Sequence, residues 1–572
     1  MIFSDLIDTP IKKNRKKIIA VELIILSIIL SLHAILLNTY FVPIFFGVDP
    51  NGYHVSGKIF SEKSNFSFTP YDSASFVGRM WVINEEGKAY PKYPPFYPLL
   101  CGIMIRFFGE YSDLYINYYL SIASVFLIYL LSRLLGLSSW ALLTALNLSL
   151  NPVCNYYGIR QVSHPSSLFF VLLGFTLFFF SLRIQKLFSK SILFFLSGVI
   201  IAFSSGIRYT DFLLAFPPYF ILLFLNKRKF FFIILYTLGL IIPFAILAYY
   251  HYNAFGHPLK TGYSLTEEQY GFSLLYFVEN IRFYILGLLN DGLGPSLILF
   301  LFGFILITKT SLISSLFFAS WIFPTFFLYA SYYWAPEKNY NGFLRFLIPS
   351  FIPAIILSIY FIKNIIAKLI GDKIFFKILF VIVFILINSC WGLFLYIENS
   401  EQEFKRAIKQ KIAIDFILSK IEAGSVIIAS KDLLNYLDYE QKYILYTEEI
   451  FNQQKLKNLI ERVNTDEPTG LQKKRAKELE NFFINVSQRE YREKLDKLIK
   501  EHLNKGRKIF FVFLSNNKKR LPQKLPIKYY LKEVAEKRTI IPPYKFLPPI
   551  KLKNLEKENK IESLIITIMQ LE

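Results

Sequence analysis

The chain has 572 residues, of which 54% are hydrophobic and 18% aromatic, while only 19% are charged. Because about a quarter of the residues in a soluble domain are charged, this composition excludes a soluble two-domain enzyme, a disordered chain and a secreted disulfide scaffold. It predicts a polytopic membrane protein with a polar tail. The net charge of +22 is expected to interact with anionic membrane lipid and not with nucleic acid.

The N-terminus combines a basic cluster with a long apolar run. Residues 1–17 contain Lys12-Lys-Asn-Arg-Lys-Lys17, and an apolar run follows from Ile18 to about Phe46. This run is too long for the core of a signal peptide. We interpret it as an uncleaved first span whose basic end lies in the cytoplasm.

The polar residues 47–93 are predicted to form a first outer loop. Segment 94–108 is apolar but shorter than the roughly 20 residues that a span needs, so it is expected to be a juxtamembrane or re-entrant helix. Counting the remaining apolar segments with the first gives about eleven spans, and this count keeps the basic loops on the cytoplasmic side. The later segments are 115–134, 138–157, 165–183, 190–207, 210–226, 229–250, 292–308, 311–334, 344–366 and 374–397.

An odd number of spans places residues 398–572 outside the membrane. In this tail, Ser425–Ala429 and Lys508–Leu514 are predicted strands, and helical periodicity is found in three segments, 432–437, 455–463 and 473–500. Pro542-Pro543 and Pro548-Pro549 mark extended connections. The expected fold is an all-α polytopic membrane module over 18–397 with a small extracytoplasmic α/β domain over 398–572.

Four charged residues are predicted to converge at the outer ends of spans. Asp49 follows the first span, where partial desolvation suits a carboxylate to act as a general base; the alternative is a helix-terminating turn with Pro50. Lys92 lies in the segment Tyr90-Pro-Lys-Tyr-Pro-Pro-Phe-Tyr-Pro98. Its ammonium group could bind a phosphate, or it could snorkel from an aromatic belt.

The other two are arginines. Arg208 lies in a tight turn between two spans, close enough in sequence to Asp211 for a structural ion pair. Arg345 begins a late span, and its alternative role is that of an interfacial anchor. Four histidines, His54, His164, His251 and His257, are also predicted on the outer side. They could bind a metal or shuttle protons, but no fixed spacing supports a metal site, which favours ordinary loop histidines.

These motifs together resemble those of the GT-C superfamily of integral-membrane glycosyltransferases. Within it, they are most similar to the protein O-mannosyltransferases and the lipid A aminoarabinose transferases. The resemblance rests on their order along residues 15–400. The motifs are Asp49 to Tyr53, Lys92-Tyr-Pro-Pro-Phe-Tyr-Pro-Leu-Leu100, Arg208-Tyr209, Tyr252-Asn-Ala-Phe-Gly-His-Pro-Leu-Lys-Thr-Gly-Tyr263 and Gly342-Phe-Leu-Arg-Phe-Leu-Ile-Pro349.

The resemblance implies a hexosyltransferase that moves a sugar, with inversion, from a polyprenyl-phosphate donor to an acceptor hydroxyl. Asp49 matches the catalytic carboxylate of the family, and Lys92 matches the position that meets the lipid phosphate, with Arg208 and Arg345 as further phosphate-binding positions. It also implies substrate contacts from four aromatic side chains, namely Tyr53, Tyr90, Tyr93 and His164. Many members have Asp-Glu at Asp49-Pro50 and Gly at Phe96, and some have an acidic residue near His164.

No metal cofactor is required by this chemistry, although a divalent cation is compatible with it. The acceptor could be a protein, a glycolipid or a glycan, and the expected location is the plasma or inner membrane, with the site and the tail outside. Three alternatives remain open. The chain could be a transporter or flippase for lipid-linked sugars, although it has no internal repeat, an oligosaccharide ligase of the same fold, or an inactive member that binds the lipid-linked sugar.

Overall fold

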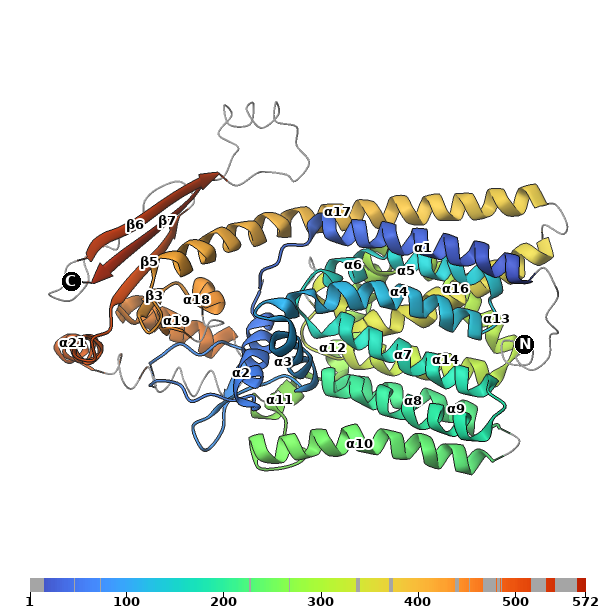
Figure 1. Cartoon of the computed structure of the whole chain (residues 1–572), viewed down its shortest axis with the longest axis horizontal. Helices are drawn as coiled ribbons and strands as arrows, with labels where there is room; N and C mark the ends of the chain where they lie inside the picture. Colours follow the sequence, from blue (N-terminus) through green and yellow to red (C-terminus); the bar gives the residue numbers. More distant parts are fainter. Residues whose placement is uncertain are drawn as a thin grey trace.

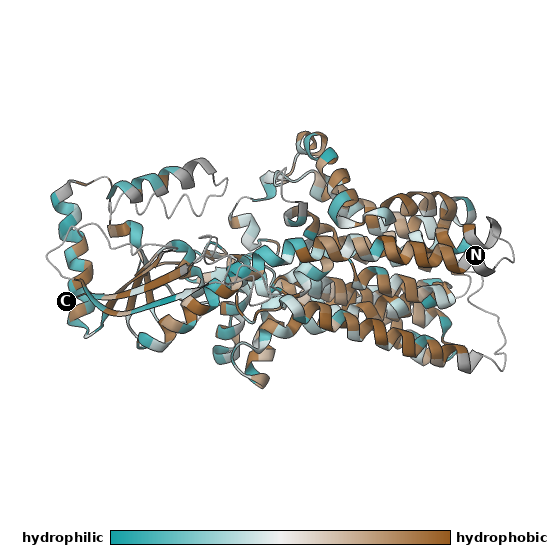
Figure 2. Ribbon diagram, turned by 90° about the horizontal axis from the view of Figure 1, so that it is seen from above, coloured by the Kyte–Doolittle hydropathy of each residue, from teal (hydrophilic) through white to brown (hydrophobic). Residues whose placement is uncertain are grey.

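The computed structural model describes residues 15–571 except for 46, 73, 226–227, 267, 336–339, 370–373, 438–441, 452, 467–479, 481–483, 485, 516–530 and 541–562. A bundle of near-parallel helices occupies one end of the molecule and a sheet domain the other, with residues 47–93 between them (Figure 1). Figure 2 shows that apolar residues dominate the bundle, whereas polar and apolar residues are mixed at the opposite end. The membrane module and the C-terminal α/β domain expected from the sequence are thus confirmed.

Eight helices within the described ranges are long and apolar enough to cross a membrane. A ninth span results if α12 (Leu274–Gly287) and α13 (Pro295–Thr310), which meet at a bend of 113°, are counted as one. The eight are α1 (Arg15–Tyr40), α4 (Ile116–Leu134), α7 (Ser163–Arg183), α8 (Leu187–Ile207), α10 (Lys229–Phe255), α14 (Leu312–Ala330), α16 (Ile348–Leu369) and α17 (Ile374–Lys420).

Two of the eleven predicted apolar segments form broken helices. Segment 138–157 divides into α5 (Ala141–Ser149) and α6 (Pro152–Gly158), because the Asn151 side chain accepts from the Cys154 amide and Pro152 opens the second helix. Segment 210–226 divides at Pro217 into a 3-10 helix, η5 (Tyr209–Ala215), and α9 (Pro217–Leu222). Segment 94–108 forms the short helix α3 (Phe96–Phe108), as its length predicted.

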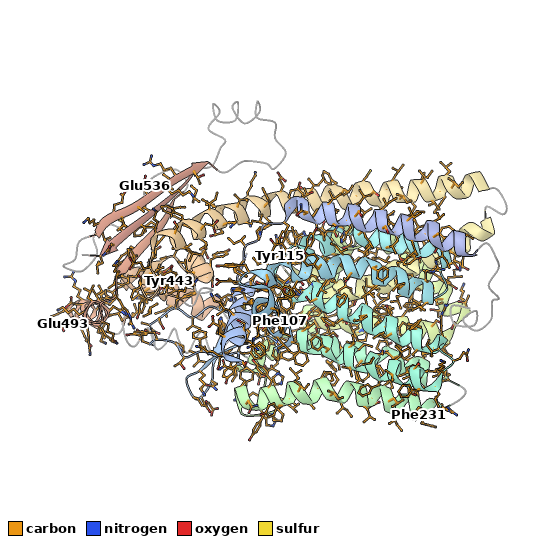
Figure 3. The ribbon with its side chains drawn as sticks, in the orientation of Figure 1. Phe107, Tyr115, Phe231, Tyr443, Glu493 and Glu536 are labelled. Atoms are coloured by element: carbon orange, nitrogen blue, oxygen red, sulfur yellow. The ribbon has the colours of Figure 1, made fainter. Side chains whose placement is uncertain are left out.

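The bundle is held together by buried aromatic side chains and by close backbone contacts. Trp321 of α14 packs against Phe175 of α7 at a ring distance of 4.2 Å. Helices α8 and α10 approach at Gly198 and Gly239, where an added Cβ would lie 2.2 Å and 2.1 Å from a backbone oxygen of the other helix. Such small residues permit the tight packing used between membrane helices. Side chains such as Phe231 of α10, 44% exposed, cover the outer surface (Figure 3).

The first outer loop forms two small substructures. A π-helix, η2 (Asn51–Val55), continues directly into α2 (Ser56–Lys63), and a hairpin pairs β1 (Trp81–Ile83) with β2 (Ala89–Pro91) in antiparallel register. Helix α2 packs on α3 at Gly57, where a Cβ would lie 2.6 Å from Cys101 Cβ. The two glycines Gly57 and Gly102 therefore bring the loop and α3 together.

The C-terminal domain has a five-stranded sheet in the order β4-β3-β5-β7-β6. Strands β3 (Val426–Ala429), β4 (Ile444–Thr447) and β5 (Ile509–Ser515) are parallel, and β7 (Ser563–Leu571) and β6 (Leu531–Ile540) continue the sheet in antiparallel pairing. The two predicted strands are β3 and β5. The helices predicted at 432–437 and 455–463 correspond to α18 (Lys431–Leu437) and α19 (Gln453–Asp466), and the second half of the one predicted at 473–500 corresponds to α21 (Gln488–Asn504). Most of residues 473–485 lie outside the described residues. Both proline pairs lie outside the described residues.

Two features join this domain to the rest of the chain. Helix α17 runs without a break across the predicted boundary at residue 398. In addition, one hydrophobic cluster contains Val55 and Trp81 of the first loop together with Leu433 of α18 and Phe510 of β5. The first loop and the sheet domain therefore share a core.

The remaining short elements lie between the spans, except for the last, which lies between β4 and α19 in the C-terminal domain. They are η3 (Ser112–Tyr115), η4 (Ser138–Trp140), α11 (Gly262–Leu265), η6 (Glu268–Gly271), η7 (Leu288–Gly292), α15 (Tyr340–Leu344), η8 (Arg345–Leu347) and η10 (Glu448–Phe451).

Candidate functional site

Asp49 lies between the first span and η2, and its carboxylate joins two distant parts of the chain. One oxygen, Oδ2, is 2.8 Å from Nη1 of Arg345 in η8, and the other, Oδ1, accepts a hydrogen bond of 2.9 Å from the Tyr93 hydroxyl. The Asp49 and Arg345 side chains remain 17% and 20% exposed, so the pair lies at the edge of the protein interior where a substrate can reach it.

Tyr93 and Tyr53 form a buried aromatic stack beneath Asp49. Their rings are 4.4 Å apart at an angle of 22°, and the Tyr53 hydroxyl donates to Ser163 Oγ at 3.1 Å. Burial, followed by the charge of Asp49, raises the pKa of both phenols. Both hydroxyls therefore stay protonated, and Tyr93 acts as a hydrogen-bond donor to the carboxylate.

The Phe346 ring is a common neighbour of three nitrogen-bearing side chains. The Arg345 and Arg208 guanidinium carbons lie 5.1 Å and 5.8 Å from its centre, and the His164 ring lies 5.6 Å away. Arg208 donates from Nη2 to the Tyr329 hydroxyl at 2.8 Å. We call Arg208, Arg345 and His164 the arginine–histidine cluster.

Several nitrogens of this cluster have no hydrogen-bond partner among the residues that the structure describes. These are Arg208 Nη1, Arg345 Nε and both ring nitrogens of His164, all buried. Buried polar groups are nearly always paired, so each exception calls for an explanation. Unpaired guanidinium N–H groups beside an accessible carboxylate fit an anionic ligand that contributes the missing acceptors.

Arg208 does not form the ion pair with Asp211 that its sequence position allowed. The Asp211 carboxylate accepts a hydrogen bond from the Ser167 hydroxyl instead, while Arg208 turns to Tyr329. The pair is also separated by geometry, because Arg208 ends α8 in an extended conformation and Asp211 already belongs to η5. Arg208 therefore takes part in the arginine–histidine cluster and not in an ion pair with Asp211.

Lys92 follows β2 and meets a carboxylate that sequence reasoning did not predict. Its Nζ lies 2.5 Å from Oε1 of Glu268 in η6, and it also lies 5.5 Å from the centre of the Tyr263 ring. The loop that carries both partners is pressed onto Lys92 at Gly262, where a Cβ would lie 2.3 Å from Lys92 Cα. In this structure, the Lys92 ammonium group is therefore paired with the Glu268 carboxylate.

The remaining predicted residues divide between the site and its surroundings. Tyr90 packs against Phe255 at 5.8 Å, so its described contact is with the C-terminal end of α10. His54 is buried against Asp113, with 2.8 Å between Nδ1 and Oδ2. Among the described residues, no group of three or more His, Cys, Asp or Glu side chains could hold a metal ion.

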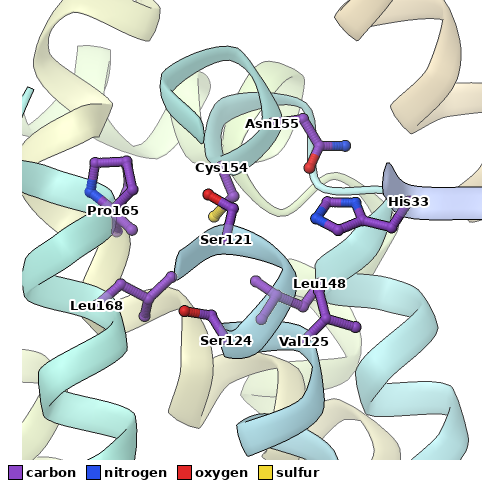
Figure 4. Close-up of a pocket in the computed structure, with 10 residues that line it drawn as sticks. His33, Ser121, Ser124, Val125, Leu148, Cys154, Asn155, Pro165 and Leu168 are labelled. Carbon is purple, nitrogen blue, oxygen red and sulfur yellow. The ribbon is translucent and has the colours of Figure 1, made fainter. Parts of the chain in front are cut away.

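Figure 4 shows a pocket inside the bundle, lined by His33, Ser121, Cys154 and Pro165 among others. His33 donates from Nδ1 to the Ser149 carbonyl oxygen, 3.0 Å away, and its Nε2 has no partner among the described residues. The pocket touches the segment that carries His164 through Pro165, but Asp49 and Lys92 do not line it. It is therefore separate from the candidate site.

Sequence reasoning missed Glu268, Tyr329 and Phe346. Phe346 follows Arg345 directly, but aromatic residues are so common in this chain that the neighbour carried no signal. Glu268 lies in an outer loop of 41 residues predicted at 251–291, where nothing local indicated contact with Lys92.

No protein-family model matches this chain, and no curated protein matches its sequence. Solved structures do match its fold. The oligosaccharyltransferase of Archaeoglobus fulgidus in the apo form has a TM-score of 0.52 at 12% identity, covering 86% of this chain and 69% of that chain. The same enzyme tethered to an acceptor peptide has a TM-score of 0.50 at 12% identity, with the same coverage.

A structure of ArnT from Cupriavidus metallidurans in the apo state has a TM-score of 0.49 at 11% identity, covering 84% of this chain and 91% of that chain. At that score it adds nothing about the fold. The chain therefore shares the fold of the Archaeoglobus fulgidus oligosaccharyltransferase, and the membrane fold expected from the sequence resemblance is confirmed.

Proposed function

We propose that this chain is an inverting glycosyltransferase that moves a sugar from a polyprenyl phosphate to an acceptor hydroxyl. The observation that carries the proposal is the accessible Asp49 carboxylate beside the arginine–histidine cluster, whose buried nitrogens lack partners. A base next to unfilled anion-binding groups suits a reaction in which a hydroxyl is deprotonated while a phosphate leaves.

In the proposed reaction, Asp49 takes the proton of the acceptor hydroxyl as its oxygen attacks the anomeric carbon. The bond between that carbon and the phosphate oxygen breaks, and the phosphate leaves with the electron pair. Arg208, Arg345 and Lys92 stabilise the charge that develops on it. Attack from the face opposite the leaving group inverts the anomeric centre.

Arg345 links the two halves of this reaction. In the structure its Nη1 lies 2.8 Å from Asp49 Oδ2, so the ion pair occupies one of the two carboxylate oxygens. When the donor phosphate binds, its charge competes for the guanidinium and frees that oxygen to take the proton of the acceptor hydroxyl. The base therefore becomes active only when the donor is in place.

Lys92 completes the phosphate site once Glu268 releases it. A phosphate oxygen then takes the place of the Glu268 carboxylate oxygen. The Lys92 side chain, only 11% exposed, therefore keeps an anionic partner. The residues present do not fit a preset metal site, since the Asp49 oxygens are taken by Arg345 and Tyr93. In the proposed reaction, fixed cationic side chains therefore stabilise the leaving phosphate in place of a divalent cation.

The proposed function also implies a location in the cell and a set of partners. The lipid tail of the donor lies against the apolar surface of the bundle, and the acceptor approaches between the bundle and the sheet domain. We place this end outside the plasma or inner membrane, because the basic N-terminus belongs at the cytoplasmic end. A protein, a glycolipid or a glycan could supply the hydroxyl.

The test is a transfer assay in proteoliposomes with a panel of radiolabelled polyprenyl-phosphate sugars and lipid-linked oligosaccharides, plus a membrane extract as acceptor. Asp49→Asn should lower transfer by the roughly 10²–10⁴-fold typical of a lost general base. Asp415→Asn is the matched control, since Asp415 is an exposed carboxylate on α17 paired with Lys411. It should transfer like the wild type.

Three outcomes separate the alternatives. Near-normal transfer by Asp49→Asn would refute the assignment of the base. Release of label only from lipid-linked oligosaccharides would favour a ligase of the same fold. Donor binding without release of label by the wild type would favour a transporter or a binding protein.

A further inference from the structure

The C-terminal domain contacts the chain on both sides of Asp49, once at the backbone and once at a side chain. Two residues before it, the Gly47 amide donates a hydrogen bond of 3.3 Å to the Tyr436 hydroxyl oxygen in α18. Two residues after it, the Asn51 side-chain amide donates to the Asn435 carbonyl at 3.0 Å. Neighbouring residues of one short helix thus hold both flanks of the candidate base.

Each flank is a place where the chain needs support. Gly47 has φ of +90°, a conformation that side chains rarely adopt, and it turns the chain from the end of α1 toward η2. Asn51 is wholly buried and opens the π-helix η2, and its Oδ1 accepts from Trp81 Nε1 at 2.6 Å. Single-turn π-helices occur often at functional sites.

Simple docking of the sheet domain does not require these polar contacts. The shared hydrophobic cluster, which includes Leu433 and Leu434 of α18, already joins the domain to the first loop. Burial raises the pKa of Tyr436, so the phenol stays neutral and offers a fixed oxygen to Gly47. The polar contacts add direction, because hydrogen bonds fix orientation as apolar burial does not.

We infer that α18 is a positioning element for Asp49, and that Tyr436 is its positioning residue. Through Gly47 and Asn51, the C-terminal domain sets the position from which the Asp49 carboxylate reaches the acceptor hydroxyl. This inference rests on the proposed function for its catalytic consequence. Its structural part, the restraint of the segment 47–55, is independent of that function.

The test compares Tyr436→Phe with Tyr491→Phe in the full-length protein. Tyr491 is the matched control, because its hydroxyl donates to the Ile450 carbonyl at 2.6 Å inside the same domain and its ring lies in a hydrophobic cluster that includes none of residues 47–55. Hydrogen–deuterium exchange of that segment should become several-fold faster in Tyr436→Phe and stay unchanged in Tyr491→Phe. Equal exchange in both variants and the wild type would overturn the inference.

The transfer assay then tests the catalytic part. Tyr436→Phe should lower kcat about tenfold with little change in the donor KM, since small misplacement of a catalytic group is costly. The same substitution in the Asp49→Asn background should have no further effect. An equal loss in both backgrounds, or a loss of folded protein alone, would overturn a positioning role.

The two arms keep failures apart. If the wild type transfers no label, the proposed function fails, while the exchange experiment still decides whether α18 restrains the segment. If exchange is unchanged while transfer requires Asp49, the proposed function stands and the positioning role is refuted.

Discussion

Replacing Glu268 by glutamine should strengthen donor binding, although the substitution removes an ion pair. Glu268 holds Lys92 at 2.5 Å, and the two side chains are 15% and 11% exposed. A donor phosphate that hydrogen-bonds to Lys92 must either displace the carboxylate or sit beside it. In Glu268→Gln the neutral amide neither competes for the ammonium group nor repels the phosphate.

The magnitude follows from the geometry. A phosphate oxygen within hydrogen-bonding reach of Lys92 Nζ would lie roughly 4 Å from the Glu268 carboxylate, where two unit charges repel by about 4 kcal/mol at an effective dielectric constant near 20. Rotation of the Glu268 side chain and partial solvation relieve part of this repulsion. A remaining gain of about 1.4–2.8 kcal/mol corresponds to roughly 10- to 100-fold tighter binding.

The assay is calorimetric titration of a short-chain polyprenyl phosphate into the protein in nanodiscs. Glu279→Gln is the control, because Glu279 is an exposed carboxylate on the nearby helix α12, and its loss should change affinity little. The gain should disappear in the double variant Lys92→Ala, Glu268→Gln. Weaker binding by Glu268→Gln than by the wild type would refute the reasoning and make Glu268 a ligand of the substrate.

Four further outcomes are expected. Arg208→Lys should bind the same polyprenyl phosphate about tenfold more weakly, because an ammonium group lacks the planar donor fork of arginine; unchanged titrations would remove Arg208 from the phosphate site. Arg345→Gln should lower kcat more than it raises the donor KM, and steady-state kinetics that move only KM would contradict its link to Asp49. Gly47→Ala should cost roughly 1–2 kcal/mol of stability and reduce transfer. Gly87→Ala, also at positive φ with open space around it, should cost similar stability in thermal unfolding and leave transfer intact; equal transfer by both variants would contradict the role of Gly47. A chelator should change the transfer rate less than twofold, and strong stimulation by added Mg²⁺ or Mn²⁺ would require a metal ligand beyond the described residues.

The sequence predicted the membrane module well, because its apolar segments are long and its basic residues are placed asymmetrically. The residues that interrupt two of these helices, Asn151-Pro152 and Pro217-Pro218, can be found in the sequence. The average hydropathy of a segment nevertheless does not indicate where a helix within it breaks. In the tail, β7 was missed although Ser563–Leu571 is rich in isoleucine. Strand β6 has alternating charges, LKEVAEKRTI, which suit its place at the edge of the sheet.

The candidate site was predictable in part for a similar reason. Charged residues at the outer ends of spans must gather on one side, so the grouping of Asp49 with Arg345 follows from topology. The choice of partners does not, because it depends on contacts between segments far apart in the chain: Asp49 and Arg345 are 296 residues apart. Local spacing instead suggested Arg208 with Asp211, and Ser167 on α7 takes the place of the arginine.

Helix α17 has a mechanical consequence for the acceptor. Its 47 residues contain no proline and extend for about 70 Å, of which the charged part after Ile397 accounts for roughly 35 Å beyond the apolar stretch. A continuous helix without a proline holds the sheet domain at a fixed distance from the apolar stretch. It does not let the domain move aside as a flexible linker would. In the proposed reaction, a large acceptor has to reach Asp49 past the sheet domain and the first loop, which share a hydrophobic core.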